Sequence, residues 1–241
     1  MVTISVVVRT FFSRFLLLLT LIIGFPVVLL MLVLPEGMRY QNKFLFWSLD
    51  LFHRAIIWGA SVPVTFKGRE NIPNGPVVYA ANHQSSLDVP LVGVLARGKP
   101  HIWLAKHDLM EWKLLRWVLP RLSVLVDASS QSKAMRSMIN LMRIVEGKDI
   151  DIMIFPEGGR YPDDKVHPFY GGFVTLAKML GRPVVPVYIS GVNKVYPPDT
   201  FWVHYYPIEV VVGKPFMLQE GETDEAFKDR VFAWFVEQSK G

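Results

Sequence analysis

The chain contains no cysteine among its 241 residues, and this absence excludes several kinds of chemistry. It rules out a disulfide framework, a thiolate nucleophile and a zinc site of the cysteine type. The sequence also has no internal repeat and no low-complexity linker, and its length fits one ordinary domain with some additional helix. Any catalysis must therefore come from other side chains within a single catalytic domain.

Acidic residues are fewer than basic ones, which gives a formal charge of +5 and a pI near 9.4. Such a balance favours binding to nucleic acid, to anionic lipid or to an anionic substrate such as a phosphate ester. The mean hydropathy of +0.29 separates these alternatives, because it is typical of a membrane protein and unusual for a soluble nucleic-acid binder. We therefore expect a lipid bilayer, and no nucleic acid, as a partner.

Charged residues are absent between residues 15 and 35, a run long enough to cross a bilayer as a helix. A cleaved signal peptide would have a shorter apolar core that ends in small residues, and no such site precedes Glu36. Gly24-Phe25-Pro26 interrupts the run, so it forms either one kinked span or two short helices that enter one leaflet and return. Residues 40–60 mix aromatic and charged side chains, which suits the interface between water and lipid. Residues 1–62 are thus predicted to be membrane-anchoring helices.

After Lys67, short apolar runs alternate with amphipathic stretches, and this alternation is typical of an α/β domain. For residues 63–241 we predict a mostly parallel central sheet flanked by helices. The expected strands are residues 77–81, 101–105, 124–127, 150–155, 184–189 and 208–212. Helical spacing of apolar residues predicts two helices whose stripes belong to the core, one with Met135, Met138, Ile139, Met142 and Val145 and one with Phe227, Val231, Phe232 and Phe235.

A polar cluster, Asn82-His83-Gln84-Ser85-Ser86-Leu87-Asp88, follows the first of these strands, where α/β sheets usually build their sites. A histidine can accept a proton from a hydroxyl, and a carboxylate bonded to its other ring nitrogen fixes the tautomer. Positions five apart lie about 140° apart around an ideal helix, so His83 is expected in the turn before a helix and Asp88 in its first turns. The alternative is that these polar residues only cap the helix.

A second polar turn, Pro156-Glu157-Gly158-Gly159-Arg160, follows the predicted strand at residues 150–155. The two glycines would let a ligand approach the backbone, and exposed N–H groups with Arg160 suit an anion. Glu157 could orient a substrate hydroxyl or pair with a basic neighbour. The alternative is an ordinary Gly-Gly turn with a solvated ion pair.

Together, Asn82-His83-x-x-x-x-Asp88 and Phe155-Pro156-Glu157-Gly158-Gly159-Arg160 resemble the glycerolipid acyltransferase family, which includes 1-acylglycerol-3-phosphate acyltransferase. The resemblance extends through the segment 104–109, which is similar to the family's Lys-x-x-Leu block. It also includes residues 183–191, which are similar to its proline-containing fourth block. About residues 65–215 are covered.

The resemblance implies that the chain transfers a fatty acyl group from a thioester, carried on CoA or acyl carrier protein, to a lysophospholipid hydroxyl. His83 would take the proton of that hydroxyl while Asp88 holds the imidazole, so neither an acyl-enzyme nor a cofactor is needed. Glu157, Gly158 and Gly159 would line the acceptor site. The cations for the acceptor's phosphate would be Lys106 and Arg160.

The sequence departs from the family pattern at positions that bear on the acceptor. The family commonly has a phosphate-binding arginine in a block that here reads Leu125-Val126-Asp127-Ala128, so Ala128 replaces it. Gly159 stands where threonine is commoner, and Tyr170 stands where lysine is often found. Substitute cations could come from Arg121, Lys133 or Arg136. The acceptor is therefore either lysophosphatidic acid, to give phosphatidic acid in phospholipid biosynthesis, or another lysolipid, lyso-aminolipid or glycolipid.

The expected location follows from the donor. A straight span that kept Arg9 and Arg14 in the cytoplasm would place the remaining chain on the other side, away from activated acyl donors. We therefore favour a monotopic, re-entrant anchor over a single straight span. The expected location is the cytoplasmic face of a membrane, such as the bacterial inner membrane.

Three other functions fit parts of the sequence. A serine esterase would use Ser85 or Ser86, although neither lies in a Gly-x-Ser-x-Gly elbow. A metal-dependent phosphodiesterase would use His83, Asp88, His101 and His107, whose spacing matches no common metal pattern, so no metal is expected. A non-catalytic lipid carrier is compatible with the anchor and the charge. His53, His167 and His204 have no evident partner and are expected to be surface or structural residues.

Overall fold

The computed structural model describes residues 3–106, 115–127, 129–197 and 200–240. The helices are α1 (Ile4–Val33), α2 (Glu36–Arg39), α3 (Lys43–Gly59), α4 (Asp88–Gly93), α5 (Leu115–Leu122), α6 (Gln131–Val145), α7 (Gly172–Leu180), α8 (Val192–Val195) and α9 (Asp224–Gln238), with short 3₁₀ turns η1 (Arg69–Asn71) and η2 (Val94–Ala96). The strands are β1 (Val64–Lys67), β2 (Val78–Ala81), β3 (His101–Lys106), β4 (Ser123–Val126), β5 (Asp151–Ile154), β6 (Val184–Ser190) and β7 (Ile208–Val212).

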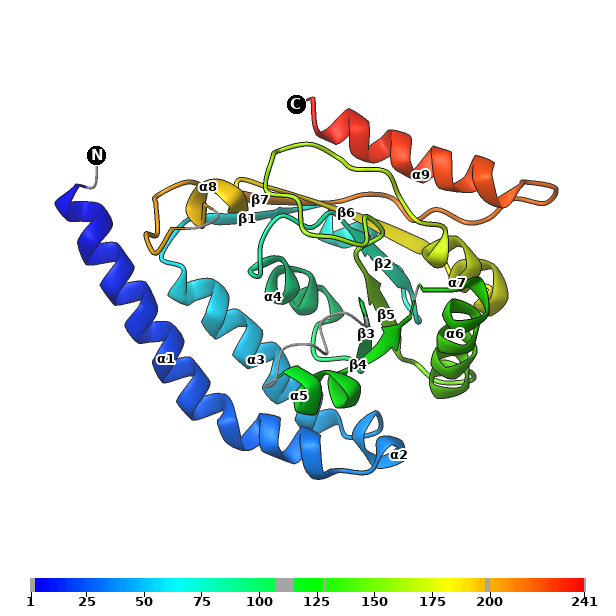
Figure 1. The fold of residues 1–241 in the computed structure, drawn as a ribbon, viewed down its shortest axis with the longest axis horizontal. Helices are drawn as coiled ribbons and strands as arrows, with labels where there is room; N and C mark the ends of the chain where they lie inside the picture. Colours follow the sequence, from blue (N-terminus) through cyan, green and yellow to red (C-terminus); the bar gives the residue numbers. More distant parts are fainter. Residues whose placement is uncertain (1–2, 107–114, 128, 198–199, 241) are drawn as a thin grey trace.

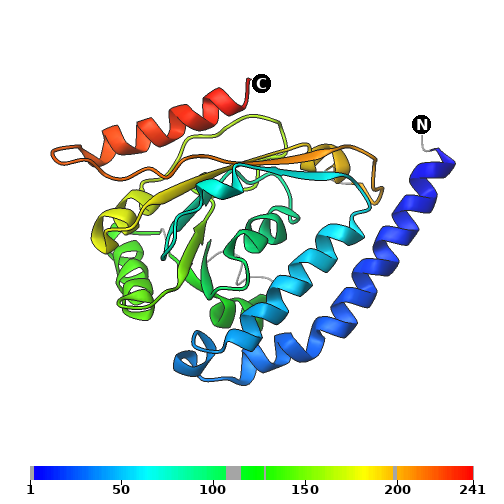
Figure 2. The same cartoon turned by 180° about the vertical axis from the view of Figure 1, so that it is seen from behind.

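The strands form one sheet in the order β1-β7-β6-β2-β5-β3-β4, in which β6 and β7 are antiparallel and the other neighbours are parallel. Alternate residues of β2 enter different cores: Val78 and Ala80 pack toward α6, α7 and α9, whereas Tyr79 and Ala81 pack toward α4. Figures 1 and 2 show the sheet with helices against both faces. Two-sided burial explains why its central strands are continuous apolar runs. The predicted α/β fold with a mostly parallel sheet is confirmed.

The N-terminal hairpin (residues 4–59) consists of α1 and α3, which run side by side and are joined by the turn that contains α2 (Figure 1). The helix α1 continues through Pro26, so the prediction that residues 15–35 could form two short helices is wrong. At Gly24 a side chain would collide with the ring of Phe52 on α3, so this glycine lets the two helices meet closely.

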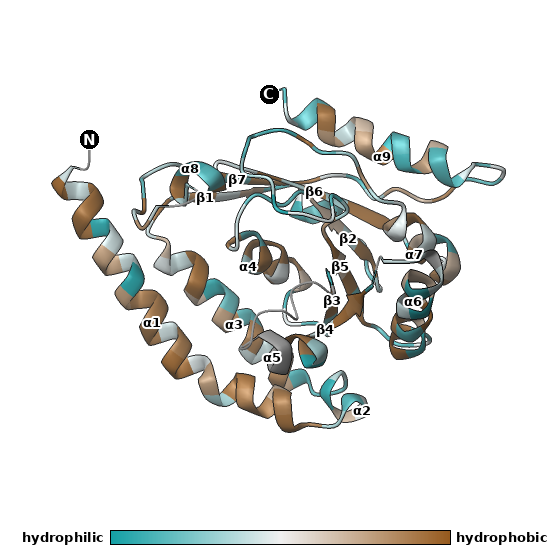
Figure 3. Cartoon of the chain, viewed as in Figure 1, coloured by the Kyte–Doolittle hydropathy of each residue, from teal (hydrophilic) through white to brown (hydrophobic). Residues whose placement is uncertain are grey.

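The helix α1 is long and apolar enough to cross a membrane. Figure 3 shows apolar residues along nearly its whole length. Most of this apolar surface is exposed, as for Phe15, Leu18 and Ile22, whereas the core helix of a soluble domain would bury it. The exposed surface is consistent with the predicted anchor.

The other helix of the hairpin, α3, takes part in the core of the α/β domain. Leu45 and Phe46 are fully buried with residues of β2, β3 and β5, and Ala60 is buried with residues of α4 and β7. The division of the chain at residues 62 and 63 stays a prediction, and residues on both sides of it contribute to both hydrophobic cores.

All six predicted strands are present within a residue or two of the expected bounds, and the two predicted helices are present as α6 and α9. One short edge strand, β1, was not predicted, because its side chains alternate between half-buried and exposed and it has no continuous apolar run. In α6 the prediction of the core stripe is partly wrong. Met135 and Ile139 are exposed, and the helix instead buries a face that includes Met138, Leu141 and Val145 against the sheet.

Candidate active site

The turn after β2 carries His83, and α4 begins at Asp88, as the spacing of the two residues predicted. The ring nitrogen Nδ1 of His83 lies 2.8 Å from Oδ2 of Asp88. Because a carboxylate can only accept, Nδ1 carries the proton, and Nε2 holds the lone pair that can accept another. The His83 side chain is 19% exposed and that of Asp88 is fully buried, so the imidazole lies between a buried anion and the outside.

The carboxylate of Asp88 also shapes the turn that carries His83. Its Oδ2 accepts hydrogen bonds from the main-chain N–H of Gln84 at 2.6 Å and of Ser85 at 2.7 Å. Three donors therefore converge on one oxygen, which keeps a fully buried charge compensated. The pairing with His83 is therefore present, whereas the helix-capping alternative is wrong, because the N-cap of α4 is Leu87 and no side chain caps it.

Aromatic rings fix the plane of the imidazole. The ring of Phe155, which follows β5, stacks on His83 with centroids 4.0 Å apart and planes 9° apart, and Trp103 of β3 packs against Phe155 at 5.2 Å. With one face covered and Nδ1 bonded, the ring has little freedom to rotate.

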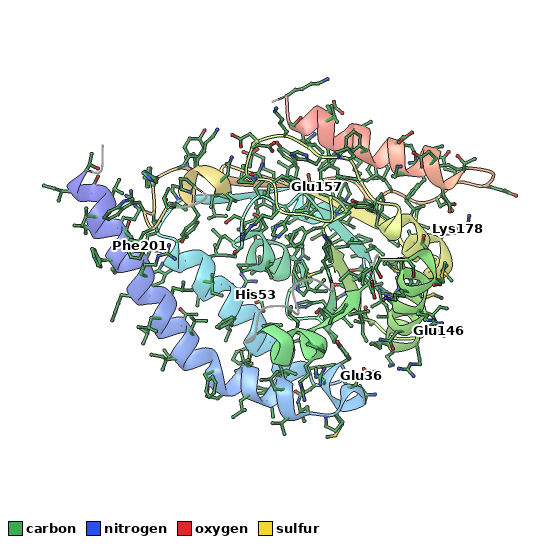
Figure 4. The ribbon with its side chains drawn as sticks, in the orientation of Figure 1. Glu36, His53, Glu146, Glu157, Lys178 and Phe201 are labelled. Carbon is green, nitrogen blue, oxygen red and sulfur yellow. The ribbon has the colours of Figure 1, made fainter. Side chains whose placement is uncertain are left out.

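Glu157 connects the two motifs through the main chain. Its Oε2 accepts from the N–H of His83 at 3.1 Å, and its Oε1 accepts from the N–H of His167 at 3.3 Å. Burial raises the pKa of the Glu157 carboxyl to about 7, although these two hydrogen bonds lower it. With the residue 2% exposed (labelled in Figure 4), its carboxylate points into the protein and positions His83.

The carbonyl oxygen of His83 is bonded to the same turn, because it accepts from the N–H of Tyr161 at 2.8 Å. Asn82, just before His83, is tied to β6 by a pair of buried hydrogen bonds with the main chain of Ile189, at 2.8 and 2.7 Å. Hydrogen bonds thus fix the main chain of His83 and of the residue before it.

Both glycines of the second turn are needed for close packing. Gly158 has a φ of +63°, and a Cβ there would lie 2.7 Å from the ring of Tyr170. A Cβ on Gly159 would lie 2.9 Å from the ring of Tyr161. Tyr170, which stands where a lysine is often found, therefore packs over the turn.

Two predicted cations lie at this edge of the sheet. Arg160 is exposed and its Nη1 donates to the hydroxyl of Ser86 at 2.8 Å, so the two motifs also meet through side chains. Lys106 is the exposed last residue of β3, which pairs with β5 in a parallel register that brings Lys106 to the edge where the Glu157 turn begins.

Two of the three substitute cations lie on α6: Lys133 pairs with Asp127 at 3.2 Å, and Arg136 is exposed. Ala128, and the segment from His107 to Leu109, lie outside the described residues.

Of the residues proposed for a metal, Asp88 bonds to His83, His107 lies outside the described residues, and the described residues contain no cluster of three possible metal ligands. His101 lies at the amino end of β3, whereas His83 follows the carboxyl end of β2, so the two are at opposite edges of the parallel sheet. The hydroxyl of Ser85 accepts from the N–H of Leu87 at 3.4 Å, and that of Ser86 accepts from Arg160. The Nδ1 of His83 is occupied by Asp88.

Sequence reasoning missed a second His-Asp pair close to the site. The Nε2 of His167 lies 3.0 Å from both carboxylate oxygens of Asp163, and its ring stacks on Tyr161 with centroids 3.8 Å apart. The spacing of four residues between Asp163 and His167 was the available signal. The other two histidines differ in burial: His53 is buried and His204 is half-buried.

The arrangement can carry out one kind of step directly. A hydroxyl at Nε2 of His83 would lose its proton to the ring, and the resulting imidazolium would be stabilised by Asp88. Arg160, which donates to Ser86 in the turn that carries His83, would stabilise an anionic group on the same substrate.

Comparison with known proteins agrees with this chemistry. Residues 63–190 match the family model described as Acyltransferase. A chloroplastic protein of Brassica napus named 1-acyl-sn-glycerol-3-phosphate acyltransferase BAT2 is 28% identical over 210 residues, which are 84% of this chain and 57% of that protein. A protein of Pseudomonas aeruginosa named 1-acyl-sn-glycerol-3-phosphate acyltransferase is 29% identical over 214 residues, 85% of this chain and 79% of that protein.

A solved structure shares the fold. It is the 1-acyl-sn-glycerophosphate (LPA) acyltransferase PlsC from Thermotoga maritima, with a TM-score of 0.76 and 21% identity, covering 98% of this chain and 95% of that one. The chain spans less than two thirds of the plant relatives, 57% of the Brassica napus protein and 60% of a Limnanthes alba protein with the same enzyme name. The family model covers more than half of the chain and includes both motifs, and the chain therefore belongs to the Acyltransferase family.

Proposed function

We propose that this protein transfers a fatty acyl group from an acyl thioester to the free hydroxyl of 1-acylglycerol-3-phosphate, to give phosphatidic acid. The observation that carries the proposal is the hydrogen bond between His83 and Asp88, with Asp88 held by three donors. Membership of the family supports the reaction class. The names of the plant and bacterial relatives support the acceptor.

In the proposed reaction, Nε2 of His83 removes the proton as the acceptor oxygen attacks the thioester carbonyl. The C–S bond then breaks, and the imidazolium returns its proton to the leaving thiolate. Asp88 stays ionised and stabilises the imidazolium between these two transfers. The donor is acyl-CoA or acyl carrier protein, and the reaction needs no covalent enzyme intermediate.

The proposed acceptor partitions into lipid, so the reaction takes place at a membrane surface. The exposed apolar side chains of α1 would enter the bilayer, and the hairpin with α3 would bring the chain back to the cytoplasmic face. A monotopic anchor of this kind keeps the site in contact with both a lipid acceptor and a water-soluble donor.

The test is an acyl-transfer assay of the purified protein against a panel of lysolipids with both donors. We expect transfer to 1-acylglycerol-3-phosphate and a loss of at least about a hundredfold in His83→Ala, the usual scale for a general base. The matched control is His167→Ala, which removes the histidine of the second His-Asp pair. No transfer to any lysolipid, or transfer that survives in His83→Ala, would reject the proposal.

A further inference from the structure

The first half of α1 is bonded to the α/β domain by its polar side chains. Thr10 accepts a hydrogen bond from the N–H of Val203 at 2.9 Å, and Ser13 lies 3.3 Å from the hydroxyl of Tyr196. Arg14 donates from Nη2 to the carbonyl of Phe201 at 3.2 Å. Figure 4 shows Phe201 beside α1. This part of the helix is therefore attached to protein, and its polar face is directed toward the domain that carries the site.

A cavity of about 460 Å³ lies between α1 and the turn that carries His83. Ser13, Arg14 and Leu17 line it from α1, and Ile56 and Gly59 from α3. The opposite wall contains Gln84, Ser85, Ser86 and Arg160, which belong to the two motifs. Its volume is in the range of small-molecule sites. A larger cavity, of about 570 Å³, is lined by residues of α1, α3 and β1 and lies away from both motifs.

The cavity carries two positive charges. Arg14 and Arg160 line it, and no Asp or Glu is among its lining residues in the described part of the chain. Two guanidinium groups that share a cavity repel each other, and an anion bound in the cavity would relieve this repulsion.

We propose that Arg14 and Arg160 together bind a phosphate group of the substrate, so that the N-terminal helix is part of the substrate site. This proposal rests on the proposed acyl transfer. Guanidinium groups bind phosphate oxygens through paired hydrogen bonds, and the hydroxyls of Ser85 and Ser86 are adjacent donors. Arg14 supplies the cation that the sequence lacks at Ala128, from a segment distant in the chain.

Two phosphate groups have the required chemistry: the phosphomonoester of a glycerolipid acceptor and the phosphates of an acyl-CoA donor. The position of the cavity favours the acceptor. Gln84, Ser85 and Ser86 directly follow His83, and in the acceptor the reacting hydroxyl and the phosphate are on adjacent carbons of glycerol. The phosphates of CoA are separated from its thioester by the length of pantetheine.

The experiment measures KM for both substrates in full-length protein. Arg14→Gln is compared with Arg9→Gln, a matched control on the same helix whose guanidinium stacks on Tyr205 at 4.6 Å and does not line the cavity. We expect Arg14→Gln to raise KM for 1-acylglycerol-3-phosphate about tenfold to a hundredfold, the range for a hydrogen bond to a charged group. Arg14→Lys should recover part of the loss, and KM for a monoacylglycerol, which has no phosphate, should not change.

The KM values distinguish the acceptor phosphate from the phosphates of CoA. A rise confined to KM for acyl-CoA would assign the phosphate to the donor and overturn its assignment to the acceptor. Equal KM values in Arg14→Gln and Arg9→Gln for both substrates would overturn the proposal as a whole.

A binding measurement keeps the proposal testable without turnover. Glycerol 3-phosphate should raise the Tm of the wild type and of Arg9→Gln, and should raise that of Arg14→Gln and Arg14→Lys less. If the wild type acylates no lysolipid, the proposed function fails, but a loss of this stabilisation in Arg14→Gln would still support the phosphate site. Equal stabilisation of all four proteins would contradict it.

Discussion

Replacing Asp88 by asparagine tests the central pair with little change in shape. The amide oxygen can still accept from the N–H groups of Gln84 and Ser85, so the turn should keep its form. Each of the three hydrogen bonds to Oδ2 changes from a charged to a neutral acceptor, a loss of about 1 kcal/mol per bond. We expect the free energy of unfolding to fall by at most about 3 kcal/mol, because burying a neutral group also avoids a desolvation cost.

The effect on catalysis should be larger. The bond from Nδ1 at 2.8 Å stabilises the imidazolium only while residue 88 is an anion, so Asp88→Asn should lower kcat by about 10²–10⁴-fold, as the equivalent change does in a Ser-His-Asp triad. The control is Asp163→Asn, which neutralises the exposed pair with His167 and should change kcat less than about threefold. Circular dichroism checks that both variants are folded. If Asp88→Asn keeps more than about a tenth of the wild-type kcat, the assigned role of Asp88 is wrong.

Three further predictions concern the structure around His83. The pKa of Glu157 is raised from about 4.5 unfolded to about 7 folded, so its stabilising contribution is full below pH 4.5 and is lost as pH rises through 7. Urea titrations should show the wild-type stability falling relative to Glu157→Gln by up to about 3 kcal/mol over that interval, and parallel curves would contradict the shift. Asn82→Ala should lower the free energy of unfolding by about 2–4 kcal/mol, because two buried main-chain groups of Ile189 lose their partners, and a loss below 1 kcal/mol would refute this. Gly158→Ala should lower Tm more than Gly147→Ala, because both glycines have positive φ but only Gly158 lies against a ring, that of Tyr170. Equal Tm values would contradict this, and would mean that Tyr170 moves aside at no cost.

The parts of the site that the sequence predicted correctly are local in the chain. His83 and Asp88 are five residues apart. The apolar run before them indicates a strand, and the polar residues between them indicate a turn before a helix. That pattern was enough to place the histidine before the helix and the carboxylate at its start. The central strands were equally predictable, because burial on both faces leaves mostly apolar residues in them.

The contacts that were not predicted join residues far apart in the chain. The role of Glu157 in lining the acceptor site stays a prediction, and the hydrogen bonds that its carboxylate accepts from the main chain of His83 and His167 were not predicted. Every residue except proline has a main-chain N–H donor, so the sequence does not show which of them a side chain will bind. The placement of Arg14 and Arg160 in one cavity was not predicted either, since it depends on how the N-terminal hairpin docks against the domain.

The double attachment of the His83 backbone to the turn after β5 has a consequence for chimeric enzymes. The N–H of His83 donates to Glu157, and its carbonyl oxygen accepts from the N–H of Tyr161. The turn after β5 is therefore bonded to the turn after β2 at two points. A graft of residues 157–161 from a relative with a different acceptor would also shift the base. Selectivity and rate should therefore change together in such hybrids, and exchanging both loops as one unit is the way to transfer either property.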